Sequence, residues 1–173
     1  MDRNLAQDSL RSVAAARRTT SELRAYREAG SVVAAWGLVW SAGYGTQQFA
    51  PSAASLVWMA GWVCAIAWMA TRPRAHDDIR ALATWIVMVA FVFAVLTVVR
   101  ADTRTAAMVF GLVVAAGYIA LGIWAGSRFA VLGAAVLLAA CLGWWMVPQW
   151  LYLTLALGGG VALVVGGMWL QRP

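Results

Sequence analysis

The chain carries little charge and few reactive side chains. Only 12% of its 173 residues are charged, none is lysine, one is histidine and two are cysteines. About a quarter of the residues of a soluble globular domain are charged, so this composition excludes an ordinary soluble protein. Two cysteines also cannot build a disulfide framework. Cys64 and Cys141 each lie near the middle of an apolar stretch, where a thiol packs as a small apolar side chain.

Catalytic motifs are absent as well. The sequence contains no HExxH, CxxC or GxSxG motif and no glycine-rich phosphate-binding loop. Its long apolar stretches hold no acidic, basic or histidine side chain. General acid–base catalysis and proton-coupled transport usually need such groups. We therefore expect no enzyme activity, no cofactor and no metal ion.

Long apolar stretches make up most of the sequence, since 63% of its residues are hydrophobic. Each stretch approaches or exceeds the roughly 20 residues that an α-helix needs to cross the hydrocarbon core of a bilayer. The sequence predicts an all-α integral membrane protein, with a bundle of six transmembrane helices in residues 31–173 and a short N-terminal segment, residues 1–30. The predicted spans are residues 31–49, 53–71, 81–99, 105–127, 129–147 and 150–170.

The second, fourth and sixth predicted spans end in a similar way. Each closes with a tryptophan three or four residues before an arginine: Trp68 before Arg72, Trp124 before Arg128 and Trp169 before Arg172. Two interpretations fit this pattern. The bundle consists of three degenerate copies of one helical hairpin, or each of these helices has the aromatic and basic ending that is common at a membrane surface.

The arginines are distributed unevenly between the two ends of the predicted spans. All 13 basic residues are arginines, and with a cytoplasmic N-terminus only Arg100 and Arg104 fall outside, which leaves 13 − 2 = 11 inside. Basic residues near span ends are retained in the cytoplasm. The sequence therefore predicts an N-in, C-in protein of a bacterial cytoplasmic (inner) membrane. Anionic headgroups of the cytoplasmic leaflet account for the positive charge, so nucleic acid is not expected as a partner.

The stretch TRPRAHDDIRAL, residues 71–82, holds the only histidine of the chain. Its place between the second and third spans gives the charged residues structural roles: the arginines set the topology, Pro73 ends one helix, and Asp77 or Asp78 caps the next. The alternative is a metal or acid–base site formed by His76, Asp77 and Asp78. A zinc site needs three or four ligands and no second cluster accompanies these residues, so we favour the structural roles.

One face of the first predicted span carries polar and aromatic side chains. Ser41, Tyr44 and Gln48 are spaced i, i+3 and i+7, which places them on one side of a helix. In a membrane such groups form hydrogen bonds between helices or line a ligand pocket. Neighbouring tryptophans could add an aromatic wall for an apolar or cationic ligand. The candidate pocket residues are Trp36, Trp40, Ser41, Tyr44, Gln47 and Gln48.

Small residues recur at every fourth position in several spans. Glycine and alanine at this spacing let helix backbones approach closely, which is how membrane helices commonly pack. Such faces can pack the spans of one chain or join two copies in a homo-oligomer, and the pattern does not distinguish these arrangements. The candidate packing residues are Gly37, Gly45, Gly122, Gly126, Gly158, Ala162 and Gly166.

The N-terminal segment is rich in arginine. Leu10 and Tyr26 would lie on nearly opposite sides of a straight helix, and Thr19 and Glu22 have the spacing of a capping box. The sequence therefore predicts two short helices with a break near Thr19. We expect them to lie on the anionic cytoplasmic leaflet or to bind a partner protein. The arginines concerned are Arg3, Arg11, Arg17, Arg18, Arg24 and Arg27.

Two functions fit these features. The first is a non-catalytic membrane subunit that acts as an accessory, sensor or assembly protein through a partner or through self-association. The second is a small-molecule binder or transporter that uses the face of the first span as its pocket. The absence of titratable groups from the spans favours the first.

Overall fold

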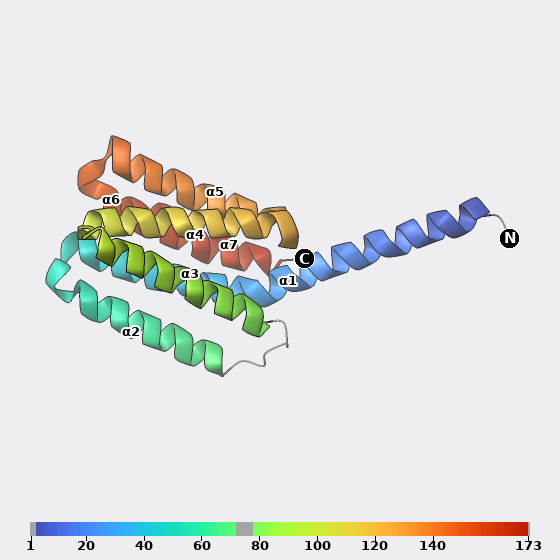
Figure 1. The fold of residues 1–173 in the computed structure, drawn as a ribbon, viewed down its shortest axis with the longest axis horizontal. Coiled ribbons are helices and arrows are strands. Elements are labelled where there is room, and N and C mark those ends of the chain that lie inside the picture. The colour runs from blue at the N-terminus through green and yellow to red at the C-terminus, as the bar shows by residue number, and fades with distance from the viewer. Residues whose placement is uncertain (1–2, 72–77, 173) are drawn as a thin grey trace.

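The computed structural model describes residues 3–71 and 78–172, and these residues are almost entirely helical (Figure 1). No strand occurs in them, so the all-helical class that the sequence predicts is confirmed. The α-helices are α1 (Arg3–Phe49), α2 (Pro51–Ala70), α3 (Asp78–Val98), α4 (Thr103–Ala125), α5 (Ser127–Cys141), α6 (Leu151–Thr154) and α7 (Ala162–Leu170).

Turns of the π-helical and 3₁₀ types interrupt the last two helical segments. A π-helical turn, Leu142–Met146, extends α5, and a 3₁₀ turn, Pro148–Trp150, begins the final segment. A second π-helical turn, Leu155–Val161, joins α6 to α7 and contains three consecutive glycines. Wide turns of this kind are local departures from the α-helical hydrogen-bond pattern and often mark places where a helix adapts to its neighbours.

Four helical segments are long and apolar enough to cross a membrane. They are Pro51–Ala70, Thr103–Ala125, Ser127–Met146 and Pro148–Leu170. The described part of α3 contributes a shorter apolar helix, Ala83–Val98, and the first predicted span forms the C-terminal part of α1. Each predicted apolar range is therefore mostly helical, although the fourth helix ends at Ala125 and the fifth begins at Ser127. The length and composition of four segments indicate a membrane-embedded protein.

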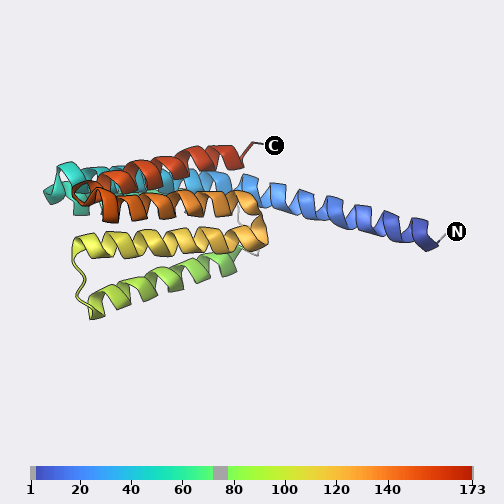
Figure 2. The same ribbon diagram turned by 90° about the horizontal axis from the view of Figure 1, so that it is seen from above.

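The first helix is a single element of 47 residues. At 1.5 Å per residue it is about 70 Å long, and Figures 1 and 2 show its N-terminal half projecting from the bundle. The prediction of a break near Thr19 is therefore wrong. A break near Thr19 would leave unpaired backbone N–H and C=O groups at two helix ends. In a continuous helix, each threonine or serine lowers helix stability by only a fraction of a kcal/mol relative to alanine. We call residues 3–25 the N-terminal rod.

The core lies where α1 meets the final segment and where α4 meets α5. Leu155 and Val136 are fully buried there, together with Leu151 and Leu163. Tyr26 is the first described side chain of α1 that is buried in this core, whereas Leu23, one turn earlier, is exposed. The apolar side chains of α1 therefore change sides along the helix because only its C-terminal half packs inside the bundle.

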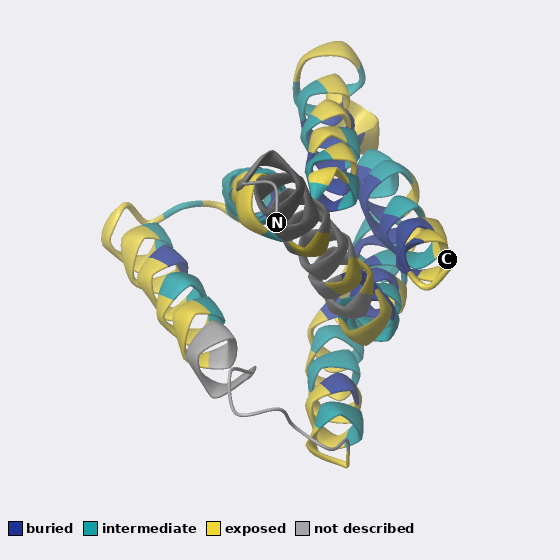
Figure 3. Cartoon of the chain, turned by 90° about the vertical axis from the view of Figure 1, so that its right-hand side faces the viewer, coloured by how far each residue is buried: buried dark blue, intermediate teal, exposed yellow. Residues whose placement is uncertain are grey.

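The helices α2 and α3 lie at the periphery. α2 packs mainly on α1, and α3 has only a small interface with α4. Figure 3 shows α3 as the outlying helix on the left, with most of its described residues exposed. The α1–α2 and α3–α4 pairs thus pack differently, because α3 and α4 are splayed while α1 and α2 lie close together.

Candidate functional site

The polar face of the first span forms hydrogen bonds to the last helical segment. The Ser41 hydroxyl donates to the carbonyl oxygen of Ala156 at 3.2 Å, within the second π-helical turn. The Gln48 side-chain amide donates to the carbonyl oxygen of Gln149 at 3.1 Å. Gln47 is half-buried beside it. The structure therefore uses Ser41 and Gln48 to connect α1 with the chain segment around α6, as polar side chains commonly do between membrane helices.

The aromatic side chains of this face pack closely against one another. Trp40 and Tyr44 are only 3% and 4% exposed, with ring centroids 5.3 Å apart. Tyr44 also contacts Trp58 of α2 edge-on at 4.9 Å, and Trp36 contacts Trp62 of α2 at 4.8 Å. These rings join α1 to α2. Helical spacing could place them on one side of α1, but it could not name their partners on another helix.

The end of the bundle opposite the rod is polar. Arg104 lies with its guanidinium 5.4 Å from the ring centroid of Trp144, and the Tyr152 hydroxyl donates to Thr103 at 3.3 Å. Among the described residues, Gln48 Oε1 and Arg104 Nε are the buried side-chain atoms without a hydrogen-bond partner. The bundle therefore presents donors and acceptors at this end, in contrast to its apolar middle.

One arginine connects three helices at the rod end. The Arg128 guanidinium lies 5.1 Å from the ring centroid of Tyr26 on α1 and 5.2 Å from that of Trp169 on α7. Its Nη1 donates to the carbonyl oxygen of Arg172 at 2.9 Å, and its backbone N–H donates to the Tyr26 hydroxyl at 3.3 Å. The Arg128 guanidinium thus lies at the C-terminal end of α7, where the helix dipole favours a cation. We call Tyr26, Gly126, Arg128 and Trp169 the Arg128 junction.

The sequence predicts Arg128 only as a topology determinant. The shared ending of the even-numbered spans, a tryptophan and then an arginine, places Trp169 near the same membrane edge. It does not show that Arg128 lies over Trp169 of α7 rather than near Trp124 of α4, the helix that precedes it in the chain. The junction depends on the proximity of α5 and α7, which the sequence pattern leaves open.

Glycines form a close contact between α1 and the final segment. A Cβ atom added to Gly37 would lie 2.6 Å from the backbone nitrogen of Val164 and 2.7 Å from the carbonyl oxygen of Gly160. One added to Gly30 would lie 2.6 Å from the carbonyl oxygen of Gly167. We call Gly30, Gly37, Gly160 and Gly167 the α1–α7 seam. Sequence reasoning named only Gly37, although the seven-residue spacing within each glycine pair was a signal for the others.

The other predicted packing residues have different neighbours. Gly122 approaches Ala130 of α5, Gly158 approaches Ala139 of α5, and Gly166 approaches Leu132 of α5. Gly126 forms the turn between α4 and α5, Ala162 is half-buried, and a Cβ on Gly45 would meet open space. The close approaches of Gly122, Gly158 and Gly166 therefore all lie within one chain.

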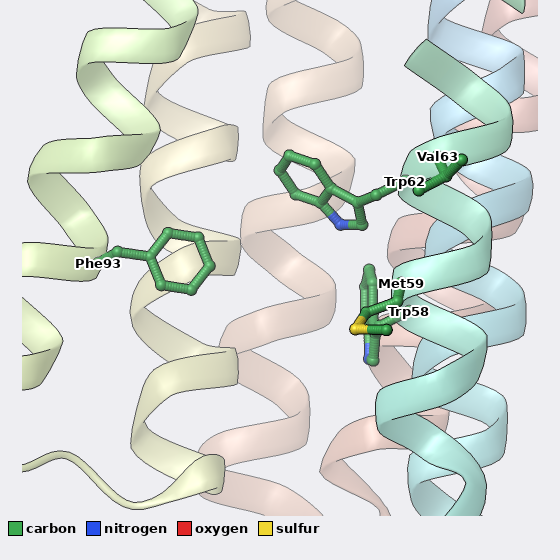
Figure 4. Close-up of a pocket in the computed structure, with 5 residues that line it drawn as sticks. All are labelled: Trp58, Met59, Trp62, Val63 and Phe93. Atoms are coloured by element: carbon green, nitrogen blue, oxygen red, sulfur yellow. The ribbon is translucent and has the colours of Figure 1, made fainter. Parts of the chain in front are cut away.

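Two apolar clefts flank α3. The first has a volume of about 400 Å³ and lies between α2 and α3 (Figure 4). The second, about 240 Å³, lies between α3 and α4. None of the six predicted pocket residues lines either cleft. The first cleft is lined by Trp58, Met59, Trp62, Val63 and Phe93, and the second by Thr84, Trp85, Met88, Gly117, Ala120, Leu121 and Trp124.

The candidate metal or acid–base residues lie at the edge of what the structure describes. His76 and Asp77 are outside the described residues, as is the side chain of Asp78, the first residue of α3. In the described ranges, no three histidine, cysteine, aspartate or glutamate side chains are grouped closely enough to hold a metal ion. Cys64 is exposed and Cys141 is half-buried, and both are free thiols.

The N-terminal arginines all belong to α1. Arg27 is exposed at the base of the rod. For Arg3, Arg11, Arg17, Arg18 and Arg24 the helical backbone is described and the side chains lie outside the described part. The rod therefore places these arginine positions along one straight helix, rather than on the two short helices that the sequence predicts.

Asp102 gives a pH-dependent contribution to the start of α4. Its carboxylate accepts a hydrogen bond from the Thr105 backbone N–H at 2.9 Å, and this bond lowers the pKa of Asp102 below its usual range. A lowered carboxyl pKa stabilises the fold above the usual value near 4, and this contribution is lost as the pH falls through the lowered pKa. We expect Asp102→Asn, which can still cap the helix, to reduce the loss of thermal stability between pH 6 and pH 3. An equal loss in both proteins would contradict this role.

Comparisons with protein-family models, with curated proteins and with solved structures find no match.

Proposed function

We propose that the chain is a six-span protein of a bacterial cytoplasmic (inner) membrane with both termini in the cytoplasm. The arginine distribution supports this orientation, because only Arg100 and Arg104 would lie outside. The arrangement in Figure 1 agrees with it, since the rod and the C-terminal end of α7 lie at the same end of the bundle. The exposed Arg27 and Arg172 then face the anionic leaflet.

In this orientation the protein acts as a non-catalytic accessory, sensor or assembly subunit that binds a partner through its rod. The continuity of α1 carries this proposal. The same helix forms the rod, the Arg128 junction and the α1–α7 seam, so a partner bound to the rod is connected to the membrane bundle without a flexible linker. Among the described side chains, Val13 and Leu23 are 51% and 42% exposed on the rod.

The energetics of an isolated helix also support a partner. Most helical stability in proteins comes from packing of an apolar face against other elements rather than from helix propensity. The rod extends about 35 Å beyond the bundle at 1.5 Å per residue. A partner that covers Val13 and Leu23 would supply the packing that the bundle itself does not give to these side chains.

Deletion of residues 1–18 should abolish partner binding and leave the bundle folded, because Tyr26 and all described core contacts lie beyond the deletion. The measurement is native mass spectrometry of the complex extracted in mild detergent, together with the thermal unfolding midpoint. A second variant replaces residues 1–18 with an alanine-rich helix of equal length, which keeps the length but removes the native surface. Both variants should lose the stoichiometric partner, and retention of the partner by the deletion variant would disprove the proposal.

A further inference from the structure

We propose that the cleft between α2 and α3 binds one phospholipid, with an acyl chain between Trp62 and Phe93 and its phosphate near Arg100. This inference needs only that the bundle is embedded in a membrane. It does not depend on the partner proposed for the rod. The chemistry and the size of the cleft support it, together with the polar residues at one end of α2 and α3.

The cleft has the chemistry of a hydrocarbon site. Figure 4 shows the Trp62 ring and the Phe93 ring projecting toward one another from α2 and α3. Met59, Val63 and Phe93 are 65%, 66% and 56% exposed, so the protein itself does not cover this surface. All five lining side chains are apolar or aromatic. A flexible apolar molecule from the bilayer is therefore the chemical class that this surface accommodates.

The size of the cleft distinguishes an acyl chain from a transmembrane helix. The volume of the cleft is about 400 Å³. An α-helix about 10 Å across would occupy that volume within roughly one turn of its length. The cleft would therefore hold little more than one turn of a helix from a second copy or from a partner. A single hydrocarbon chain is much thinner and fits the space as it is.

Polar groups lie at one end of this apolar surface, on both helices. Arg100 is exposed two residues beyond the end of α3 and follows Phe93 by seven residues. Ser52 and Ser55 are exposed on the first two turns of α2, before Met59. Because α2 and α3 run in opposite directions, the arginine and both serines lie at the same end of the bundle. The order from polar to apolar matches that of a phospholipid.

Arg100 lies at the end of the bundle that carries few basic residues. The positive-inside distribution does not require an arginine at this end. The Arg100 φ angle of 50° belongs to the C-terminal cap of α3, in which the Arg100 and Ala101 backbone N–H groups donate to the carbonyl oxygens of Thr97 and Leu96. The side chain of the nearby Asp102 accepts the capping hydrogen bond from Thr105. A guanidinium group matches the geometry of a phosphate, so a lipid headgroup is a suitable ligand for Arg100.

The test uses delipidated full-length protein in mild detergent, titrated with palmitoyl-oleoyl phosphatidylglycerol and observed by native mass spectrometry. We expect one saturable lipid per chain. Val63→Phe should remove this lipid by narrowing the cleft, and Phe93→Ala should weaken its binding by removing one wall. Ile66→Phe is the matched control, because Ile66 is 52% exposed on the same helix and does not line the cleft.

The phosphate is tested separately. Arg100→Gln should weaken binding about tenfold, as expected for the loss of a charge-assisted contact. Arg172→Gln, an exposed arginine at the opposite end, should leave the affinity unchanged. Palmitoyl-oleoyl glycerol, which lacks the phosphate, should bind more weakly and should not respond to Arg100→Gln.

Multiple non-saturable lipid adducts that are equal in all variants would overturn the proposal and indicate ordinary annular lipid. Saturable binding that is indifferent to both Val63→Phe and Phe93→Ala would place the lipid elsewhere and overturn it too.

Discussion

Gly37→Leu should prevent stable folding of the bundle, whereas Gly45→Leu on the same helix should change its stability little. The expected loss for Gly37→Leu is about 3 kcal/mol or more, at the upper end of what overpacking costs. The two positions are two helical turns apart in one small-residue pattern. They differ because Gly37 lies in the α1–α7 seam and Gly45 faces open space. The measurement is the unfolding free energy in detergent, with the yield of monodisperse protein as a second readout.

The size of this effect follows from the atoms that surround Gly37. A Cβ atom there would meet the backbone nitrogen of Val164 and the carbonyl oxygen of Gly160, and backbone atoms cannot rotate away as a side chain can. The helices would have to separate, which would also weaken the hydrogen bond from Ser41 to Ala156. Lipid gives membrane helices no hydrophobic drive to associate, so close packing is a large part of their stability. Equal unfolding free energies for Gly37→Leu and Gly45→Leu would show that the seam does not hold these helices together.

The seam also shows how far sequence periodicity can predict packing. Gly37 and Ser41 are four residues apart and both contact the final helical segment, as local helical geometry allows. The partner glycines, Gly160 and Gly167, could not be assigned, because the order of helices around a bundle is not encoded in the period of any one of them. A four-residue pattern in the last span instead selected Gly158 and Gly166, which approach α5.

The rod shows a second limit. Local signals at Thr19 and Glu22 predicted the start of a new helix, yet α1 continues through them. A capping box satisfies backbone groups only where a helix end exists, and a continuous helix has no such end to satisfy. The change of apolar side at Tyr26 reflects entry into the bundle rather than a bend. Tertiary packing, which cannot be read from the sequence pattern, determines both the continuity of α1 and the change of its apolar side.

The cleft and the Arg128 junction depend on the same kind of long-range information. The sequence places Phe93 and Trp62 on consecutive spans, where they could equally pack against each other or face lipid. The splay of α3 leaves a gap between them. At the junction, Arg128 was visible as a basic residue at a span end, while its contact with Tyr26, 102 residues away in the chain, was not. The helical segment to which each residue belongs was predictable, and its neighbours on other helices were not.

Gly126→Ala should also lower the unfolding free energy strongly, because backbone strain and a steric collision both arise at this position. Gly126 has a φ angle of 117° between α4 and α5, a conformation that side chains with a Cβ atom rarely adopt. This strain alone costs about 1–3 kcal/mol. A Cβ atom would also collide with the hydroxyl group of Tyr26. Gly111→Ala on α4 is the matched control, since its nearest neighbour is a flexible leucine side chain at 3.3 Å and its cost should stay within about 1 kcal/mol.

A double-mutant cycle separates the two costs of Gly126→Ala. In a Tyr26→Ala background the collision is absent, so Gly126→Ala should destabilise the bundle less than it does in the native chain, while the backbone strain remains. The difference in unfolding free energy between the two backgrounds measures how tightly the Tyr26 ring is held against the turn. Equal costs in both backgrounds would mean that the ring moves aside freely. The base of the rod would then be loosely attached at the Arg128 junction, and a partner bound to the rod could not act on the bundle through that junction.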